Sequence, residues 1–379
     1  MSALIGIDYT SAVHQRAGIG RYTRELVKAL ADAPTGGWSA AYRLFVANSG
    51  ARAAQSLPGE RFGWRTTRLS ERWLARLWYR LALPLPVELW TGRLNLFHAA
   101  DFFLPPTRPA TRTLVTVHDL SFVRYPDSTM PGMSRQLNNW VPRSVARADH
   151  VIAVSQATAN DLTELYGTAP GKISVLHHGV SPEFRPVTDA AQQQAVRQKY
   201  GLGERPFILS LGTIQPRKNY RRLVQAFAQL KADATLVIIG GAGWNSQAVF
   251  DEVARLGLTE RVIFPGFAAD ADLPALYSAA TLFVYPSLYE GFGLPALEAM
   301  ACGTPVVASG TSALPEVVGE AGLLVEPTDV AALAHALNTL LHDDEQRRRL
   351  SAAGLARAAS FTWPGMAARL VQVYQHLTA

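Results

Sequence analysis

Residues 282–308 read LFVYPSLYEGFGLPALEAMACGTPVVA, and this stretch decides the fold. The apolar run Leu282–Pro286 predicts a buried strand. A glycine-rich loop follows at Glu290–Gly293, and Pro295 suits the first position of a helix. A second apolar run begins at Pro305. Strand, loop, helix and strand in this order build a parallel sheet with helices on its faces, where ligands bind beyond the carboxyl ends of the strands.

The same alternation runs along the whole chain and predicts an α/β protein with two doubly wound, Rossmann-like domains. A proline-containing, polar stretch at 181–202 separates two series of strands. We therefore expect domains at 1–185 and 186–362, followed by a C-terminal helix within 363–379. The predicted strands are Ala3–Asp8, Tyr42–Ala47, Leu94–Ala99, Arg112–Val117, His150–Val154, Ile173–Leu176, Phe207–Gly212, Thr235–Gly240, Val262–Pro265, Leu282–Pro286, Pro305–Ala308 and Gly322–Val325.

Composition narrows the class of protein. With 379 residues, 48% of them hydrophobic, the chain can bury two cores of ordinary size. No apolar run is long enough to span a membrane, and the start MSALIGIDYT has no signal-peptide pattern, so we expect a cytoplasmic protein. Cys302 is the single cysteine, and no Cys/His cluster has metal-ligand spacing. We expect no disulfide and no bound metal.

The net charge of +6 is concentrated in the first half, where residues 1–185 carry 21 Lys and Arg against 13 Asp and Glu. No nucleic-acid-binding motif accompanies this charge, which argues against a nucleic-acid partner. Between Arg65 and Trp90, arginines recur every four residues among aromatic and leucine residues, at Arg68, Arg72, Arg76 and Arg80. That spacing predicts a helix with a basic stripe. It is either an interfacial helix that touches a membrane, or a solvated helix whose aromatic side joins the core.

A second motif follows the strand Phe207–Gly212, where the chain reads TIQPRKN and Asn219 is placed to cap the next helix. Arg217 and Lys218 therefore lie at the positive end of a helix. Arg binds phosphate in a bidentate manner and Lys acts as a point charge, so the pair suits a diphosphate. An ordinary surface pair of cations is the alternative.

Two further features concern small or acidic residues. Gly18 and Gly20 precede a helical pattern and allow backbone amides to approach a phosphate, although a simple tight turn explains them equally well. Glu290 lies in the loop of the deciding stretch, and Glu298 lies in its helix. Nothing in the sequence gives them the separation of a glycosidase pair. Two carboxylates that accept hydrogen bonds from vicinal hydroxyls of a ligand are the simpler interpretation.

The chain resembles the retaining glycosyltransferases of family 4 over nearly its whole length. The resemblance is carried by the motifs EGFGLPALE, ACGTPVVAS and, upstream of them, GTIQPRKN. The resemblance implies the architecture called GT-B, in which two Rossmann-like domains face each other across a cleft. It implies an N-terminal domain for the acceptor and a C-terminal domain for a nucleotide sugar, with the last helix packed back on the first domain.

The resemblance also assigns residues. Glu290 would bind hydroxyls of the transferred sugar, Glu298 the ribose, and Arg217 and Lys218 the departing diphosphate. His118, after the strand that ends at Val117, would lie against the donor sugar. The catalytic set is then His118, Arg217, Lys218 and Glu290. The donor-binding set is Gly18, Gly20, Gly212, Arg217, Lys218, Phe267, Glu290, Gly291, Phe292, Gly293, Leu294 and Glu298.

As a function, the resemblance implies metal-independent transfer of a hexose with retention of configuration. It favours mannose from GDP-mannose as donor substrate, with a saccharide or lipid-linked saccharide as acceptor and no further cofactor. Contact with the inner face of the membrane through residues 65–90 would suit a lipid-linked acceptor. Two alternatives stay open: a nucleotide-sugar epimerase of the same fold, and a non-catalytic scaffold that binds a sugar nucleotide.

Overall fold

The computed structural model describes residues 3–15, 18–33, 38–48 and 57–379, which form two compact units. The first unit contains Met1–Leu120, Arg135–Gly179 and Thr362–Ala379, and the second contains Ser121–Ser134 and Val180–Phe361. The chain thus leaves the first unit twice, after Leu120 and after Gly179, and returns to it at Arg135 and at Thr362. The acceptor and donor roles expected of the two domains stay predictions.

The first unit is built on a parallel sheet of seven strands in the order β3-β2-β1-β4-β5-β6-β7. The order changes direction at β1, which pairs with both β2 and β4. This confirms the predicted doubly wound class. The strands are β1 Ala3–Asp8, β2 Ala40–Val46, β3 Phe62–Thr66, β4 Leu96–Ala99, β5 Arg112–Val117, β6 His150–Ala153 and β7 Ile173–Val175.

The second unit repeats the plan with six parallel strands in the order β10-β9-β8-β11-β12-β13. Here β8 pairs with both β9 and β11, so the order changes direction at β8. The strands are β8 Phe207–Leu211, β9 Thr235–Ile239, β10 Val262–Gly266, β11 Leu282–Tyr285, β12 Val306–Ser309 and β13 Leu323–Val325. Strand β4 of the first sheet and strands β9, β11 and β12 of the second are buried throughout, as expected where helices cover both faces.

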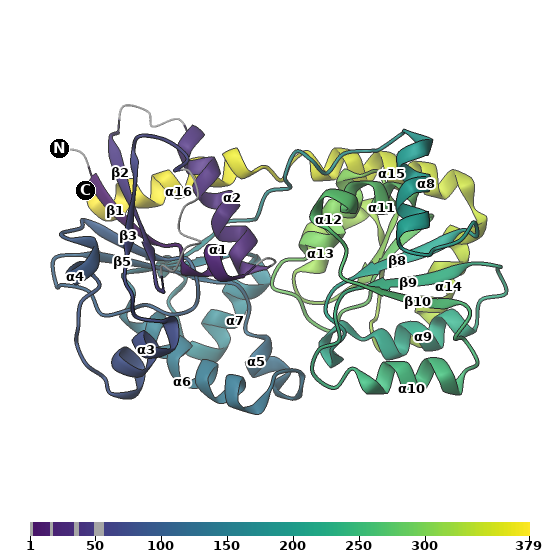
Figure 1. The fold of residues 1–379 in the computed structure, drawn as a ribbon, viewed down its shortest axis with the longest axis horizontal. Helices are drawn as coiled ribbons and strands as arrows, with labels where there is room; N and C mark the ends of the chain where they lie inside the picture. Colours follow the sequence, from purple (N-terminus) through teal and green to yellow (C-terminus); the bar gives the residue numbers. More distant parts are fainter. Residues whose placement is uncertain (1–2, 16–17, 34–37, 49–56) are drawn as a thin grey trace. The chain divides into compact units, whose positions relative to one another are not determined.

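Helices connect the strands (Figure 1). In the first unit they are α1 Thr10–His14, α2 Ile19–Asp32, α3 Glu71–Ala75, the π-helical turn η1 Arg76–Arg80, α4 Glu88–Thr91, α7 Gln156–Tyr166 and α16 Trp363–Thr378, with α6 Pro131–Arg147 beginning in the second unit. The second unit contains α5 Ser121–Arg124, α8 Ala190–Lys199, α9 Tyr220–Ala228, α10 Gln247–Arg255, α11 Leu273–Ala279, α12 Leu294–Ala301, α13 Leu314–Val318, α14 Val330–His342 and α15 Asp344–Ala358.

The C-terminal helix α16 packs beside α2 on the first sheet (Figure 1). Tyr22, Leu26 and Leu30 recur every four residues along α2 and are fully buried, which is the spacing of one helical face. Each such side chain contributes about 1.5–3 kcal/mol by leaving water. Gly179 lies where the chain meets α16: a Cβ there would be 2.1 Å from the Trp363 nitrogen, so only glycine permits this approach.

A buried chain of hydrogen bonds crosses the first unit beneath these helices. His98 on β4 bonds to the Tyr374 hydroxyl of α16 at 2.7 Å and to the Thr116 hydroxyl of β5 at 2.8 Å. Thr116 in turn lies 3.3 Å from the Tyr22 hydroxyl of α2. Burial lowers the pKa of His98 to about 3, so the ring is neutral near pH 7. These hydrogen bonds join the C-terminal helix to the centre of the sheet.

The prediction of a single helix over Arg65–Trp90 is wrong. Residues 62–66 form strand β3, which the sequence analysis did not predict, and a helical segment follows only from Glu71 to Arg80. Ser70 stops the segment from extending backwards because its side chain accepts a hydrogen bond from the Trp73 nitrogen. Arg68 therefore lies outside the helix, and the basic stripe is one arginine shorter than expected.

Among residues 3–15, 18–33, 38–48 and 57–379, no helix combines the length and the apolar character needed to cross a bilayer.

Replacing Tyr374 by Phe should lower the free energy of unfolding by about 1–3 kcal/mol, because it leaves the buried His98 nitrogen without its partner. Urea denaturation followed by circular dichroism measures this. Tyr42→Phe is the matched control: Tyr42 is also buried in the first unit, and within the described chain no hydrogen bond engages its hydroxyl. Equal stability losses in the two variants would contradict the importance of the His98 bond.

Candidate active site

Two neighbouring strands of the second sheet end at residues singled out from the sequence. β8 leads through Gly212 to η4, a turn of 3-10 helix at Pro216–Lys218, and β11 leads to the loop with Glu290. These strands lie side by side where the strand order changes direction. Ligands of such sheets bind at this position, beyond the carboxyl ends of the strands. The fold thus brings together residues that are about 70 positions apart in the chain.

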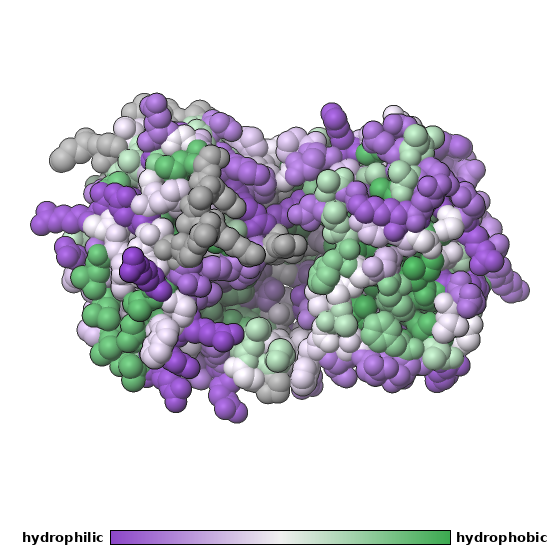
Figure 2. Space-filling model, in the orientation of Figure 1, coloured by the Kyte–Doolittle hydropathy of each residue, from purple (hydrophilic) through white to green (hydrophobic). Residues whose placement is uncertain are grey.

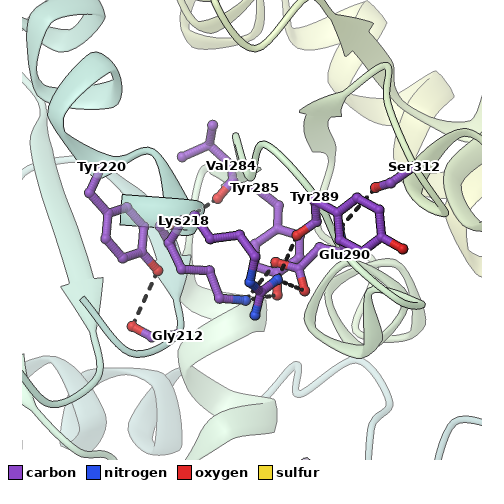
Figure 3. Close-up of polar contacts among 10 residues, drawn as sticks. Gly212, Lys218, Tyr220, Val284, Tyr285, Tyr289, Glu290 and Ser312 are labelled. Carbon is purple, nitrogen blue, oxygen red and sulfur yellow. Dashed lines mark hydrogen bonds and ion pairs between the residues drawn. The ribbon is translucent and has the colours of Figure 1, made fainter. Parts of the chain in front are cut away.

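Glu290 forms ion pairs with both cations of the site (Figure 3). Its Oε1 lies 2.6 Å from the Lys218 ammonium, and its Oε2 lies 2.9 Å from the Arg217 guanidinium. The Glu290 and Lys218 side chains are each 9% exposed, and that of Arg217 is 14% exposed. The alternative of an ordinary surface pair is therefore wrong, since the two cations are largely buried and share one carboxylate.

Partners that sequence reasoning missed hold this cluster in place. The Lys218 ammonium donates to the Tyr285 hydroxyl at 2.5 Å and lies 4.6 Å from the centre of that ring. Arg217 donates to the Tyr289 carbonyl at 2.5 Å, and the Glu290 nitrogen donates to the Ser312 hydroxyl at 2.9 Å (Figure 3). Of these, only Tyr285 carries a signal in the sequence, because it ends the strand that enters the deciding loop.

The cations decide the charge of Glu290. Burial alone would raise its pKa, but Arg217 and Lys218 outweigh that effect and lower the pKa to about 2. Glu290 is therefore ionised at any pH at which the protein would be assayed. Two cations and one carboxylate leave the cluster with one excess positive charge, which suits an anionic ligand.

Gly212 and Asn219 flank the cluster. The Gly212 carbonyl accepts a hydrogen bond from the Tyr220 hydroxyl at 3.3 Å (Figure 3). Asn219 occupies the predicted N-cap position of α9, but its side chain makes no capping bond, so that prediction was wrong. The Asn219 amide instead donates to the Pro286 and Pro327 carbonyls at 3.0 and 2.7 Å. It fastens the loop after β11 to the loop after β13.

The glycine-rich loop ends in α12, with Gly293 at the N-cap and Leu294 as first helical residue. Gly291 and Phe292 precede them, so the four residues place backbone amides at the positive end of a helix. Glu298 lies one turn further on, buried, and accepts a hydrogen bond from the Tyr277 hydroxyl at 3.0 Å. Phe267 is 80% exposed beyond β10, with its ring against Gly241.

His118 belongs to the first unit, directly after β5. Its Nε2 donates to the Ala100 carbonyl at 2.9 Å, and its ring meets the Tyr22 ring edge-on at 4.8 Å between centroids. Burial lowers the pKa of His118 to about 4, which keeps the ring neutral near pH 7. Because Tyr22 also ends the hydrogen-bonded chain from Tyr374, the C-terminal helix contributes to the position of His118.

Gly18 and Gly20 begin α2 in the same unit. Gly18 has a positive φ of 60° at the N-cap. A Cβ at Gly20 would lie 2.2 Å from the Gln15 carbonyl oxygen, so this close approach of the first turn of α2 to Gln15 requires glycine. This accounts for Gly20 without a ligand, while the roles of both glycines in donor binding stay predictions. Within the described parts of the chain, no group of three or more His, Cys, Asp or Glu could hold a metal ion.

Known proteins resemble this chain over nearly its full length. The family profile "Glycosyltransferase Family 4" matches residues 16–184, and "Glycosyl transferases group 1" matches residues 192–357. O-antigen chain mannosyltransferase B of Escherichia coli is 34% identical over 95% of this chain and 96% of its own. The sucrose-phosphate synthase structure from Thermosynechococcus elongatus has a TM-score of 0.78 at 26% identity over 99% of both chains. Anabaena HepE, solved with UDP and glucose, has a TM-score of 0.75 at 21% identity over 99% of this chain and 100% of its own.

Glu290→Gln should lower the free energy of unfolding by about 3 kcal/mol, because it leaves two largely buried cations without a counter-charge. Adding Lys218→Met to Glu290→Gln should recover part of that loss. Asp272→Asn is the control, since it removes the more exposed pair with Lys199 and should cost less than about 1 kcal/mol. Urea denaturation measures all three variants, and equal effects at Glu290 and Asp272 would contradict a buried charge cluster.

Proposed function

The chain belongs to glycosyltransferase family 4, a family of retaining hexosyltransferases with the GT-B fold, and on that premise we propose that it transfers mannose from GDP-mannose to a hydroxyl of a saccharide or lipid-linked saccharide. The observation that carries the proposal is the buried cluster of Arg217, Lys218 and Glu290 at the carboxyl ends of β8 and β11. Mannose is favoured because the Escherichia coli relative is named a mannosyltransferase.

The proposed mechanism uses the charges of this cluster. A nucleoside diphosphate would bring its phosphates to Arg217 and Lys218 and supply the negative charge that the cluster lacks. During transfer, charge grows on the departing phosphate, and two fixed cations stabilise it without reorganisation. Glu290 would then be freed in part from its ion pairs to accept hydrogen bonds from sugar hydroxyls.

Retention is a property of the family, and we propose that it proceeds here without an enzymic nucleophile. The departing phosphate would accept the proton of the attacking hydroxyl on the face that it leaves, while the sugar carries oxocarbenium character. The protein then contributes position and charge rather than a covalent bond. In this scheme, Glu298 binds the ribose, Phe267 lies near the base, and His118 lies against the donor sugar.

The donor is tested by thermal unfolding without metal in the presence of GDP, UDP or ADP, since a ligand of the folded state raises the melting temperature. We expect the largest shift with GDP. Lys218→Ala should abolish most of that shift, because it removes a phosphate contact. Glu290→Ala should keep the shift, measured from its own ligand-free melting temperature, while transfer from GDP-mannose falls at least about 100-fold.

The control is Lys28→Ala, which removes an exposed lysine of α2 and should leave both readings unchanged. A larger shift with UDP or ADP would contradict GDP-mannose and indicate a donor that carries uracil or adenine instead of guanine. Loss of the GDP shift in Glu290→Ala to the same extent as in Lys218→Ala would contradict the separate roles of the two residues.

A membrane contact through residues 65–90 is a further part of the proposal. Leu81 and Leu89 are 62% and 58% exposed, and Figure 2 shows a hydrophobic area over α4 and the chain before it. Basic residues next to such an area attract anionic lipid. Sedimentation with anionic vesicles should therefore pellet the protein at low salt, and Leu81→Ser/Leu89→Ser should reduce this. A pelleted fraction that does not change with salt concentration or with the charge of the lipid would contradict the proposal.

A further inference from the structure

A cavity of about 630 Å³ opens in the first unit, at the carboxyl ends of β1 and β4. Asp8 is the last residue of β1, and Asp101 follows β4 by two positions. These strands are neighbours where the order of the first sheet changes direction, so the cavity occupies the place at which such a sheet binds its ligand. None of the residues that line it has a role in the donor site described above.

Aromatic side chains form one wall of the cavity. The Tyr79 and Trp140 rings are stacked, with centroids 4.7 Å apart and planes at 24°. Phe103 meets the Trp140 ring edge-on at 5.5 Å. Trp78 is fixed because its indole nitrogen donates to the Leu85 carbonyl at 2.8 Å. The wall is thus ordered before any ligand binds, and it offers apolar ring surface such as the C–H face of a sugar requires.

Two carboxylates, those of Asp8 and Asp101, give the cavity its polar side. Asp8 Oδ1 accepts a hydrogen bond from the Thr10 nitrogen at 3.0 Å, and Asp101 Oδ1 accepts one from the Phe102 nitrogen at 2.7 Å. Asp8 also bonds to the Thr10 side chain, and both carboxylates line the cavity. Burial raises the pKa of Asp8 to about 6, and burial together with Asp8 raises that of Asp101 to about 7. Near neutral pH the pair both accepts and donates hydrogen bonds, which suits hydroxyl groups.

Charged residues of the helical segment Glu71–Arg80 complete the lining. Arg72, Arg76 and Arg80 recur every four residues and are exposed, while Glu71 adds one acidic group. The segment therefore contributes more positive than negative charge. Guanidinium groups bind phosphate through parallel hydrogen bonds. An anionic group attached to a ligand in the cavity would find its partners here.

We infer that this cavity binds the acceptor as a phosphorylated saccharide. A sugar ring lies against the Tyr79 and Trp140 wall, its hydroxyls bond to Asp8 and Asp101, and its phosphate is held by the arginines of α3 and η1. The inference rests on the proposed function, because an acceptor is defined only by a transfer reaction. It adds the chemical class of the acceptor and the residues that select it.

Calorimetric titration of the full chain, without donor, tests this with two probes, mannobiose and mannobiose 1-phosphate. The phosphate should tighten binding about tenfold, the effect of one good charge-assisted contact. Trp140→Ala and Asp101→Asn should each weaken binding of both probes by about tenfold or more. Arg80→Ala should remove most of the gain due to phosphate and leave mannobiose binding unchanged.

Each variant has a matched control outside the cavity lining. Trp244→Ala changes an exposed tryptophan of the second unit, Arg68→Ala an exposed arginine before the helical segment, and Asp32→Asn an exposed aspartate of α2. The controls should bind both probes like the unmodified protein. A cooperative urea unfolding transition with the same midpoint as that of the unmodified protein shows that a cavity variant is folded. Tyr79→Phe is a milder second variant should Asp101→Asn not fold.

The results separate this inference from the proposed function. A GDP shift and measurable transfer, with saccharide binding that Trp140→Ala and Asp101→Asn do not weaken, would overturn the cavity as acceptor site and leave the function standing. Saccharide binding lost in those variants, in a protein that GDP does not stabilise, would support the cavity as a saccharide site and contradict the GDP-mannose donor. An unchanged phosphate gain in Arg80→Ala, Arg76→Ala and Arg72→Ala would overturn the phosphorylated class.

Discussion

The ion pairs of Glu290 with Arg217 and Lys218 are the constraint on which the second unit depends. The three groups come from two loops that only the adjacency of β8 and β11 brings together. None of these charges would be tolerated at such low exposure without the others, because an uncompensated buried charge costs several kcal/mol. The cluster therefore couples a correctly paired sheet to a site that is charged for its ligand before the ligand arrives. The balance of charge that lets these groups be buried also leaves a positive site for an anionic ligand.

Both units place their polar groups by one topological rule. In each sheet the strand order changes direction at a central strand, β1 in the first and β8 in the second. Connections to the two neighbours of that strand leave on opposite faces of the sheet, so an opening remains between them at its carboxyl end. In the second unit this opening holds cations around one carboxylate; in the first it holds two carboxylates beside aromatic rings. A repeated fold thus carries two chemically different sites.

The sequence sufficed for what depends on local pattern. Twelve strands were placed within a few residues, because β-branched runs between helical segments have few alternative interpretations, and GTIQPRKN and EGFGLPALE identified the loops of the charge cluster. The sequence did not predict features that depend on contacts between residues far apart in the chain or on weak local signals. Phe62–Thr66 is a short edge strand with one glycine and no clear alternation, and Ser70 divides what looked like one basic helix. Asn219 stands at its cap position but bonds to two distant loops, and Ser312 reaches Glu290 from beyond β12.

The first unit shows why the C-terminal helix matters beyond its hydrophobic burial. Tyr374 on α16, His98 on β4, Thr116 on β5 and Tyr22 on α2 form a continuous chain of hydrogen bonds in the core. Buried polar groups of this kind have few acceptable alternatives, so each fixes the orientation of the next. Tyr22 then sets the edge of the His118 ring, and the His118 Nε2 is held by the Ala100 carbonyl. A residue five positions from the C-terminus therefore shares in orienting a side chain that the family resemblance places beside the donor sugar.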